Sequence, residues 1–163
     1  MTNNVSRFLA TLLIGGMIFM SACNNDRLAD IPPPDTRTIW TGPTIAFEKI
    51  VDSDPQAAAN QDRITDAVWI TRGNDGGEIF NARSEDSSDK GNSPAGTQWA
   101  MGTIDDIDNL SFRPFREAVG SPREVVGQDL VLFLTEEEIF IAVRFTDWTQ
   151  GRGGGFAYER STE

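Results

Sequence analysis

Two apolar runs near the C-terminus constrain the fold more than any other feature of the sequence. Residues 130–134 (LVLFL) are continuously apolar, which is typical of a strand covered on both faces. Residues 138–145 (EIFIAVRF) alternate instead, with an apolar side chain at every second position. A short polar segment, residues 135–137, separates the two runs. They therefore predict an antiparallel hairpin with a short connection.

A glycine-rich segment, residues 151–155 (GRGGG), precedes another alternating run, residues 156–160 (FAYER). Glycine adopts the positive φ angles that tight and bulged turns require. A phosphate-binding glycine loop would open a helix and carry a Lys-Ser/Thr pair, whereas a strand pattern follows here and that pair is missing. The pattern therefore predicts a loop that leads into a final strand.

Shorter strands are predicted upstream, in segments rich in β-branched and aromatic residues. These strands are residues 44–51, 67–72, 78–81 and 98–102, and the turn residues 73–77 predict a hairpin between the second and the third. A helix is predicted from Thr103, which can cap it, and a further helical turn at residues 115–119. Many short strands with little helix predict a mainly β fold, an antiparallel β-sandwich or jelly-roll-like single domain with one or two short helices.

The N-terminal region reads as an export signal. Residues 8–20 (FLATLLIGGMIFM) form an uncharged apolar run that follows Arg7 and ends at the small residues Ser21 and Ala22. As a helix this run would span roughly 20 Å, which is shorter than the ~30 Å hydrocarbon core of a bilayer. We therefore expect a cleaved signal peptide rather than a membrane-spanning helix.

The residues at the end of this run, Met20-Ser21-Ala22-Cys23, resemble the lipobox of bacterial lipoproteins. The resemblance implies that Cys23 becomes the N-terminus and carries fatty acyl chains such as palmitate, which anchor the protein to membrane lipid. Asn24 is not the aspartate that retains such proteins in the inner membrane, so the resemblance favours the outer membrane or the cell surface. An ordinary signal peptide followed by a free thiol is the alternative.

These features divide the chain into three parts. Residues 1–22 are the predicted signal peptide, and residues 23–38 are the lipidated cysteine with a proline-rich linker. Three consecutive prolines, residues 32–34, favour an extended polyproline II segment, so the linker is predicted to be a spacer. Residues 39–163 are the predicted β-rich domain.

Four segments of this domain together resemble an uncharacterised secreted module of environmental bacteria. They are residues 64–73 (ITDAVWITRG), 93–100 (SPAGTQWA), 145–148 (FTDW) and 153–162 (GGGFAYERST). In that module an apolar strand pair leads to F-T-x-W, a glycine loop and a closing F-x-Y-x-R-S/T. The resemblance implies an extracytoplasmic β-rich domain at the bacterial cell envelope, and it supplies no catalytic residue and no ligand.

Composition excludes several classes of function. The chain has no His and one Cys, which excludes a His-based catalytic triad, a His-ligated metal and an internal disulfide. Its 14 Lys and Arg are outnumbered by 25 Asp and Glu, so nucleic acid is not expected as a partner. With so many acidic residues, no pair of carboxylates stands out as a hydrolase site. We find no recognisable catalytic motif and expect a protein that is not an enzyme.

We expect no cofactor and no metal site, with a loose calcium site left open because calcium accepts irregular sets of oxygen ligands. The carboxylates available for such a site are those of Asp52, Asp54, Asp75, Asp105, Asp106 and Asp108.

Aromatic residues are the other candidates for binding, because flat rings bury the apolar faces of sugars. Trp69 is assigned to the core, and Trp148 is left undecided because it lies beside the glycine-rich segment. The candidate ligand-binding residues are Trp148, Tyr158, Arg152 and Asp147. The expected function is a membrane-anchored extracytoplasmic lipoprotein whose non-catalytic β-domain binds a glycan or an envelope protein. A structural or assembly component of an envelope complex and a carbohydrate-active hydrolase are the alternatives.

Overall fold

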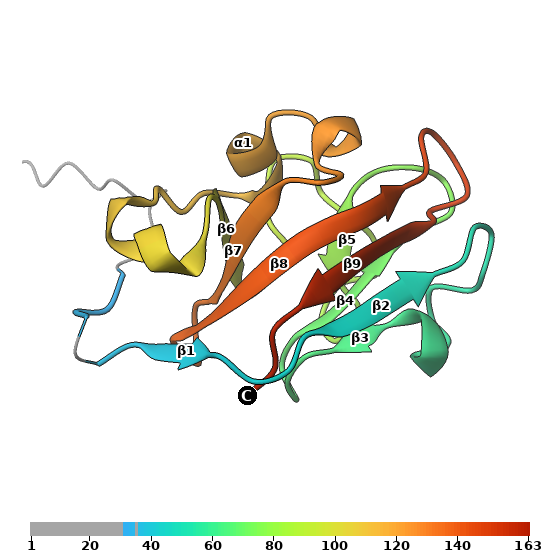
Figure 1. Cartoon of the computed structure of the whole chain (residues 1–163). Helices are drawn as coiled ribbons and strands as arrows, with labels where there is room; N and C mark the ends of the chain where they lie inside the picture. Colours follow the sequence, from blue (N-terminus) through green and yellow to red (C-terminus); the bar gives the residue numbers. More distant parts are fainter. Residues whose placement is uncertain (1–30, 35) are drawn as a thin grey trace, which may run out of the picture.

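The predicted hairpin lies at the centre of the larger of two β-sheets in the computed structural model, which describes residues 31–34 and 36–163. β7 (Asp129–Leu134) and β8 (Ile139–Trp148) pair antiparallel, with Leu132 opposite Ile141. Every residue of β7 after Asp129 is buried, as its continuously apolar sequence predicts. Figure 1 shows β8 running diagonally across this sheet.

The remaining strands of the larger sheet flank the hairpin. They are β1 (Thr38–Trp40), β2 (Ile45–Lys49), β6 (Thr97–Met101) and β9 (Phe156–Arg160). Their order is β2-β9-β8-β7-β6, and β1 pairs parallel with the first residues of β8. The predicted final strand, β9, is therefore internal, because it pairs with β8 on one side and with β2 on the other.

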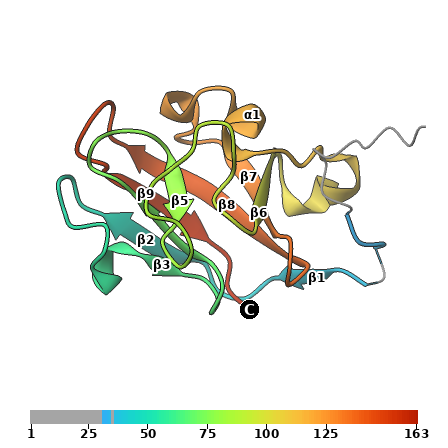
Figure 2. The same cartoon turned by 180° about the vertical axis from the view of Figure 1, so that it is seen from behind.

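The smaller sheet covers one face of the larger one. It consists of β3 (Asp62–Arg63), β4 (Trp69–Arg72) and β5 (Ile79–Asn81), in that order and all antiparallel. Figures 1 and 2, which view the molecule from opposite sides, both place this sheet against β9 and β2. The prediction of a mainly β, sandwich-like domain with little helix is confirmed.

Helical segments are short. Among residues 31–34 and 36–163 they are η1 (Ala58–Asn60), η2 (Ile104–Asn109), α1 (Phe115–Val119) and η3 (Pro122–Glu124), of which only α1 is an α-helix. The helical turn predicted at residues 115–119 is confirmed as α1. The helix predicted from Thr103 is the 3-10 helix η2, and the Thr103 side chain makes no capping hydrogen bond to it.

The main core lies between the sheets and under α1. Trp99 is fully buried there, with the ring of Phe115 edge-on at 5.1 Å. Burial of each large apolar side chain contributes ~1.5–3 kcal/mol. Trp69, which we assigned to the core, is only half-buried, and the guanidinium of Arg63 lies 4.1 Å from its ring centroid. The strand β4 turns Ile70 inward, which leaves Trp69 on the partly solvated side.

A second apolar cluster lies on the other face of the larger sheet. Phe133 and Phe140 stack there with ring centroids 4.4 Å apart. Ile31 packs against this cluster, and Pro32 is buried. The Nε of Arg37 donates to the carbonyl of Pro32 at 2.7 Å. The described end of the predicted linker is thus attached to the domain, and the packed region extends upstream of residue 39.

Within residues 31–34 and 36–163, no helix has the length and hydropathy needed to cross a bilayer. The predicted signal peptide, the lipobox and Cys23 lie outside the described residues.

Candidate functional site

A pocket of about 460 Å³ opens at one end of the sandwich. Its walls come from segments far apart in the sequence: the end of β4, the β4–β5 turn, the loop before β6, the α1–η3 region and the loop between β8 and β9. Figure 1 shows the β8–β9 loop at the end of the molecule remote from β1. A volume of this size is typical of small-molecule sites.

Positive charge distinguishes this pocket from the rest of an acidic protein. Five of the residues that line it are basic, and Asp75 is the single acidic one among them. The basic residues are Arg72, Lys90, Arg116, Arg123 and Arg152. The whole chain has a formal net charge of −11. A local cluster of cations on such a chain is suited to an anionic ligand.

Arg72 forms the fixed part of this cluster. Its side chain is 2% exposed, and Nη1 donates to the carbonyls of Thr149 and Gly155 at 2.8 and 2.9 Å. Nε donates to the carbonyl of Gly77 at 3.0 Å. Burial lowers the pKa of Arg72, and the nearby carboxylates of Asp147 and Glu78 oppose that shift. Arginine nevertheless stays charged at neutral pH, so the pocket contains a permanent buried cation.

The ring of Trp148 contacts the guanidinium group of Arg72. The guanidinium carbon of Arg72 lies 4.1 Å from the centroid of a Trp148 ring, which is a cation–π contact. The rings of Phe115 and Phe145 pack against Trp148 at 6.0 and 5.8 Å. Only 8% of the surface of Trp148 is exposed, because the side chain packs in the core and against Arg72. It does not present the open face that sugar stacking requires.

Arg116, on α1, is paired with a buried acid. Its Nε donates to Oε1 of Glu78, a residue that is only 2% exposed. Burial raises the pKa of Glu78, and the hydrogen bond and charge of Arg116 partly oppose this. The second oxygen, Oε2, is buried and accepts no hydrogen bond from the described residues. Arg116 therefore lines the pocket, but the negative charge of Glu78 partly balances its positive charge.

Arg123 and Arg152 are the exposed arginines of the pocket, and Lys90 is an exposed lysine in its lining. Arg123 lies on η3 and Arg152 on the β8–β9 loop. Within the described part of the chain, no carboxylate forms an ion pair with either of them. Their guanidinium groups are available to a ligand, and arginine binds carboxylates and phosphates in a two-point geometry.

Backbone contacts hold the β8–β9 loop that carries Arg152. The amide of Gly153 donates to the carbonyl of Asn74 at 2.8 Å, and the carbonyl of Gly153 accepts from the amide of Asp52 at 2.7 Å. The buried Nζ of Lys49 donates to Oδ1 of Asn74 at 2.8 Å, which fixes the β4–β5 turn in place. Gly154 has a φ of 61°, and a Cβ there would lie 2.4 Å from the Gly73 carbonyl. Glycine is required at this position because the two loops touch.

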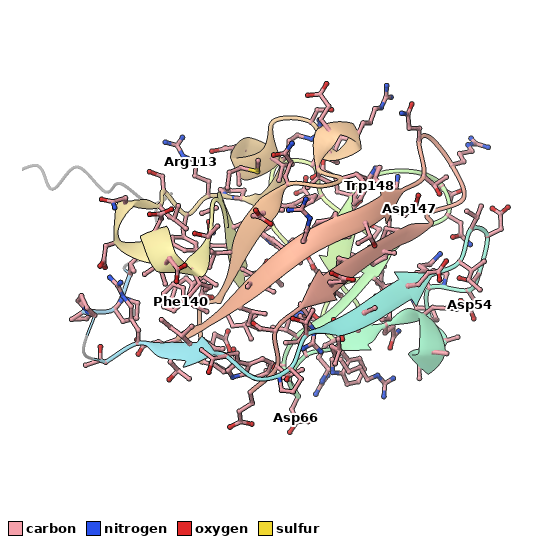
Figure 3. All side chains as sticks on the ribbon, in the orientation of Figure 1. Asp54, Asp66, Arg113, Phe140, Asp147 and Trp148 are labelled. Atoms are coloured by element: carbon pink, nitrogen blue, oxygen red, sulfur yellow. The ribbon has the colours of Figure 1, made fainter. Side chains whose placement is uncertain are left out.

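The structure brings together two of the four residues predicted to bind a ligand. Trp148 and Arg152 line the pocket. Asp147 is exposed at the same end of β8, as Figure 3 shows, but it does not line the pocket. Its negative charge opposes the lowering of the Arg72 pKa by burial. Cys23 lies outside the described residues.

Tyr158 has to be removed from the predicted site. It is 1% exposed, and its hydroxyl donates to Oδ2 of Asp62 at 2.6 Å. Position 158 belongs to the face of β9 that packs into the main core, so its side chain cannot reach a ligand.

Four cations of the pocket were missed by the sequence analysis. They belong to three local patterns: Arg72 ends a predicted strand, Lys90 lies in a polar loop, and Arg116 and Arg123 lie on or beside a helical turn. No local spacing relates them, because only the folded chain places them around one cavity.

Other parts of the molecule give weaker candidates. A second hollow of about 380 Å³ is lined by Glu136, Glu137 and Arg83 among others. Among the described residues, no group of three or more His, Cys, Asp or Glu side chains is placed to hold a metal ion.

Comparison with known proteins gives no relative: no family model, no curated protein and no solved structure matches the chain.

Proposed function

We propose that this protein is a lipid-anchored extracytoplasmic domain that binds an anionic ligand at the cell envelope. The observation that carries the binding function is the basic pocket, in which five cationic side chains from separate segments converge on one cavity. The lipobox-like sequence that ends at Cys23 supports the anchor. The site supplies charge and hydrogen-bond donors, which favours binding rather than catalysis.

The pocket is well suited to hold an anion because its central cation is fixed in advance. Arg72 is locked by three hydrogen bonds to carbonyl groups and by the ring of Trp148. A ligand therefore does not have to immobilise this side chain, and that lowers the entropic cost of binding. Arg123 and Arg152 are exposed, and an anion that enters between them loses less of its favourable hydration than it would in a closed cavity.

The position of Ile31 limits how far the domain can lie from the membrane. Ile31 already contacts the apolar cluster on the larger sheet, so only residues 24–30 separate it from Cys23. Even fully extended, the chain from Cys23 to Ile31 spans at most about 29 Å. An acylated Cys23 would thus hold the domain close to the headgroups, and two or three acyl chains make the attachment stable.

Binding is tested by titrating the full-length protein, in detergent, with galacturonate oligomers and with the neutral galactose oligomers of the same length. We expect calorimetric heat from the acidic sugars alone, and weaker binding in Arg152→Gln and Arg123→Gln. Arg83→Gln is the matched control, because Arg83 is also an exposed arginine but lies outside the basic pocket. Equal affinity for acidic and neutral sugars would overturn the proposal. So would an affinity for the acidic sugars that neither Arg152→Gln nor Arg123→Gln changes.

The anchor is tested separately with Cys23→Ala in a cell that processes bacterial lipoproteins. We expect the unchanged protein to partition into detergent and to incorporate labelled palmitate, and the variant to lose the label. An unaltered label in Cys23→Ala would show that the acyl group is attached elsewhere or that the lipobox-like sequence is not used.

A further inference from the structure

We infer that the basic pocket selects a ligand with two anionic groups joined by a hydroxylated spacer, which is the chemistry of an acidic oligosaccharide. One anionic group would meet Arg72 in the interior of the pocket, and the other would meet Arg123 and Arg152 at its exposed edge. This inference rests on the proposed function and specifies its ligand.

The cations occur at two levels of exposure, and this favours two points of contact. Arg72 is 2% exposed, whereas Lys90, Arg123 and Arg152 are exposed. The hydrogen bonds of Arg72 to the described residues use Nε and Nη1. Nη2 makes no hydrogen bond to the described residues and is the nitrogen left for a ligand. A ligand with two anionic groups can contact the buried guanidinium and the exposed arginines at the same time.

Charge balance also favours more than one anionic group. Glu78 partly balances Arg116, and Asp147 lies near Arg72, yet the five cations in the lining still outnumber Asp75, the one acidic residue among them. A ligand with a single negative charge would leave the pocket positive. A second anionic group on the same molecule binds at the high effective concentration that the first one creates.

The other lining groups suit hydroxyl groups on the spacer. Asp75, the hydroxyl of Ser121 and the backbone of Gly76 and Gly151 all border the cavity. Carboxylate, hydroxyl and carbonyl oxygens accept hydrogen bonds from sugar hydroxyls. The volume of about 460 Å³ is also far larger than one inorganic anion needs. Trp148 contributes no open ring face, so recognition depends on charge and hydrogen bonds.

The decisive experiment compares galacturonate, digalacturonate and inorganic phosphate as ligands of the full-length protein by calorimetry at two salt concentrations. We expect digalacturonate to bind at least about tenfold more tightly than galacturonate. Its affinity should also fall more steeply with salt, because two charges are neutralised instead of one. Arg152→Gln should abolish most of this advantage, and it should weaken digalacturonate binding more than galacturonate binding, because only the larger ligand is expected to use Arg72 and Arg152 together.

The outcomes separate this inference from the function on which it rests. Equal affinity for galacturonate and digalacturonate overturns the two-anion inference and leaves anion binding standing. Phosphate that binds more tightly than digalacturonate also overturns it, because the site would then recognise one compact anion. Failure of all three probes contradicts the proposed function itself. Arg83→Gln serves as the control, and circular dichroism of each variant verifies that the fold is retained.

Discussion

Asp62 and Arg160, which are 98 residues apart in the chain, form a buried two-point ion pair that joins the two sheets. Nε of Arg160 donates to Oδ2 of Asp62 at 2.6 Å, and Nη2 donates to Oδ1 at 2.9 Å. The Tyr158 hydroxyl shares the Oδ2 acceptor. Asp62 lies on β3 of the smaller sheet, and Arg160 and Tyr158 lie on β9 of the larger one. Neither carboxylate oxygen of Asp62 is left without a donor.

Asp62→Asn should strongly destabilise the domain. The substitution removes the negative charge while Arg160 remains 6% exposed, so a buried guanidinium loses its counter-charge. Breaking one side of a buried pair costs about 3–5 kcal/mol. Urea denaturation measures this loss, with Asp66→Asn as a control because Asp66 is an exposed aspartate nearby in sequence. A loss under about 1 kcal/mol, as for a surface pair, would contradict the role of this pair in joining the sheets.

Tyr158 should remain un-ionised until the protein unfolds in alkali. Burial, together with the negative charge of Asp62, raises the pKa of Tyr158 well above its ordinary value of 10.0. Above that ordinary value the unfolded chain releases the phenolic proton and the folded chain keeps it. Stability is therefore lost as the pH rises from about 10 toward the pKa of the folded state.

The measurement is direct because Tyr158 is the only tyrosine in the chain. Tyrosinate absorbance and circular dichroism should change together in an alkaline titration. Tyrosinate that forms while the dichroism is still native would contradict the prediction. Tyr158→Phe should remove this contribution to the pH dependence and also lower stability at neutral pH, because Oδ2 of Asp62 loses one donor.

Glu78→Gln should flatten the dependence of stability on pH. Burial raises the pKa of Glu78, so the folded protein holds this proton at a pH where the unfolded chain has released it. The contribution of Glu78 is complete below the ordinary carboxyl range and is lost as the pH rises through the raised pKa. Arg116 is 42% exposed and stays solvated without its partner. The variant should thus be at least as stable as the parent at neutral pH.

Urea midpoints at a series of pH values compare this variant with Glu48→Gln, in which an exposed carboxylate is removed. If Glu78→Gln and the parent lost stability in parallel as the pH rises, the buried carboxyl would not be the titrating group.

Gly154→Ala should be more damaging than Gly151→Ala, although both residues have positive φ angles. At Gly151 φ is 78° and a Cβ would meet nothing within 4 Å, so the cost is the left-handed conformation alone, roughly 1–2 kcal/mol. At Gly154 a Cβ would lie 2.4 Å from the Gly73 carbonyl oxygen, and the two loops would have to separate. Thermal unfolding compares the two variants. Equal melting temperatures would show that the two loops can separate at Gly154 without a loss of stability.

The strand pattern could be predicted because it depends on neighbours in sequence. Alternation over residues 138–145 and continuous apolarity over residues 130–134 gave β8 and β7 with the correct antiparallel pairing. The two-residue strand β3 was missed, since Asp62 and Arg63 carry no apolar signal and pair only because β4 lies beside them. The helix expected from Thr103 is a 3-10 helix, in which Ile107 is buried and Thr103 makes no capping hydrogen bond.

The candidate site could be predicted only in part. Glycines at residues 151–155 indicated a loop with an unusual backbone, and that loop does carry Arg152 to the pocket. Aromatic composition suggested Tyr158 as a ligand residue, but the direction of a side chain from a strand depends on which face the core covers. The core covers the face that contains Tyr158, and its hydroxyl is taken up by Asp62.

The sequence alone determined a short-stranded, mainly β fold and an excess of acidic residues, because periodicity and charge are local properties, and it also predicts an export signal from the apolar run at residues 8–20. Only the tertiary structure decided that Arg72, Arg116, Arg123 and Arg152 surround one cavity while the acidic majority lies elsewhere. Pairing between distant strands and contact between loops bring these arginines together, and their spacing along the sequence does not predict that arrangement.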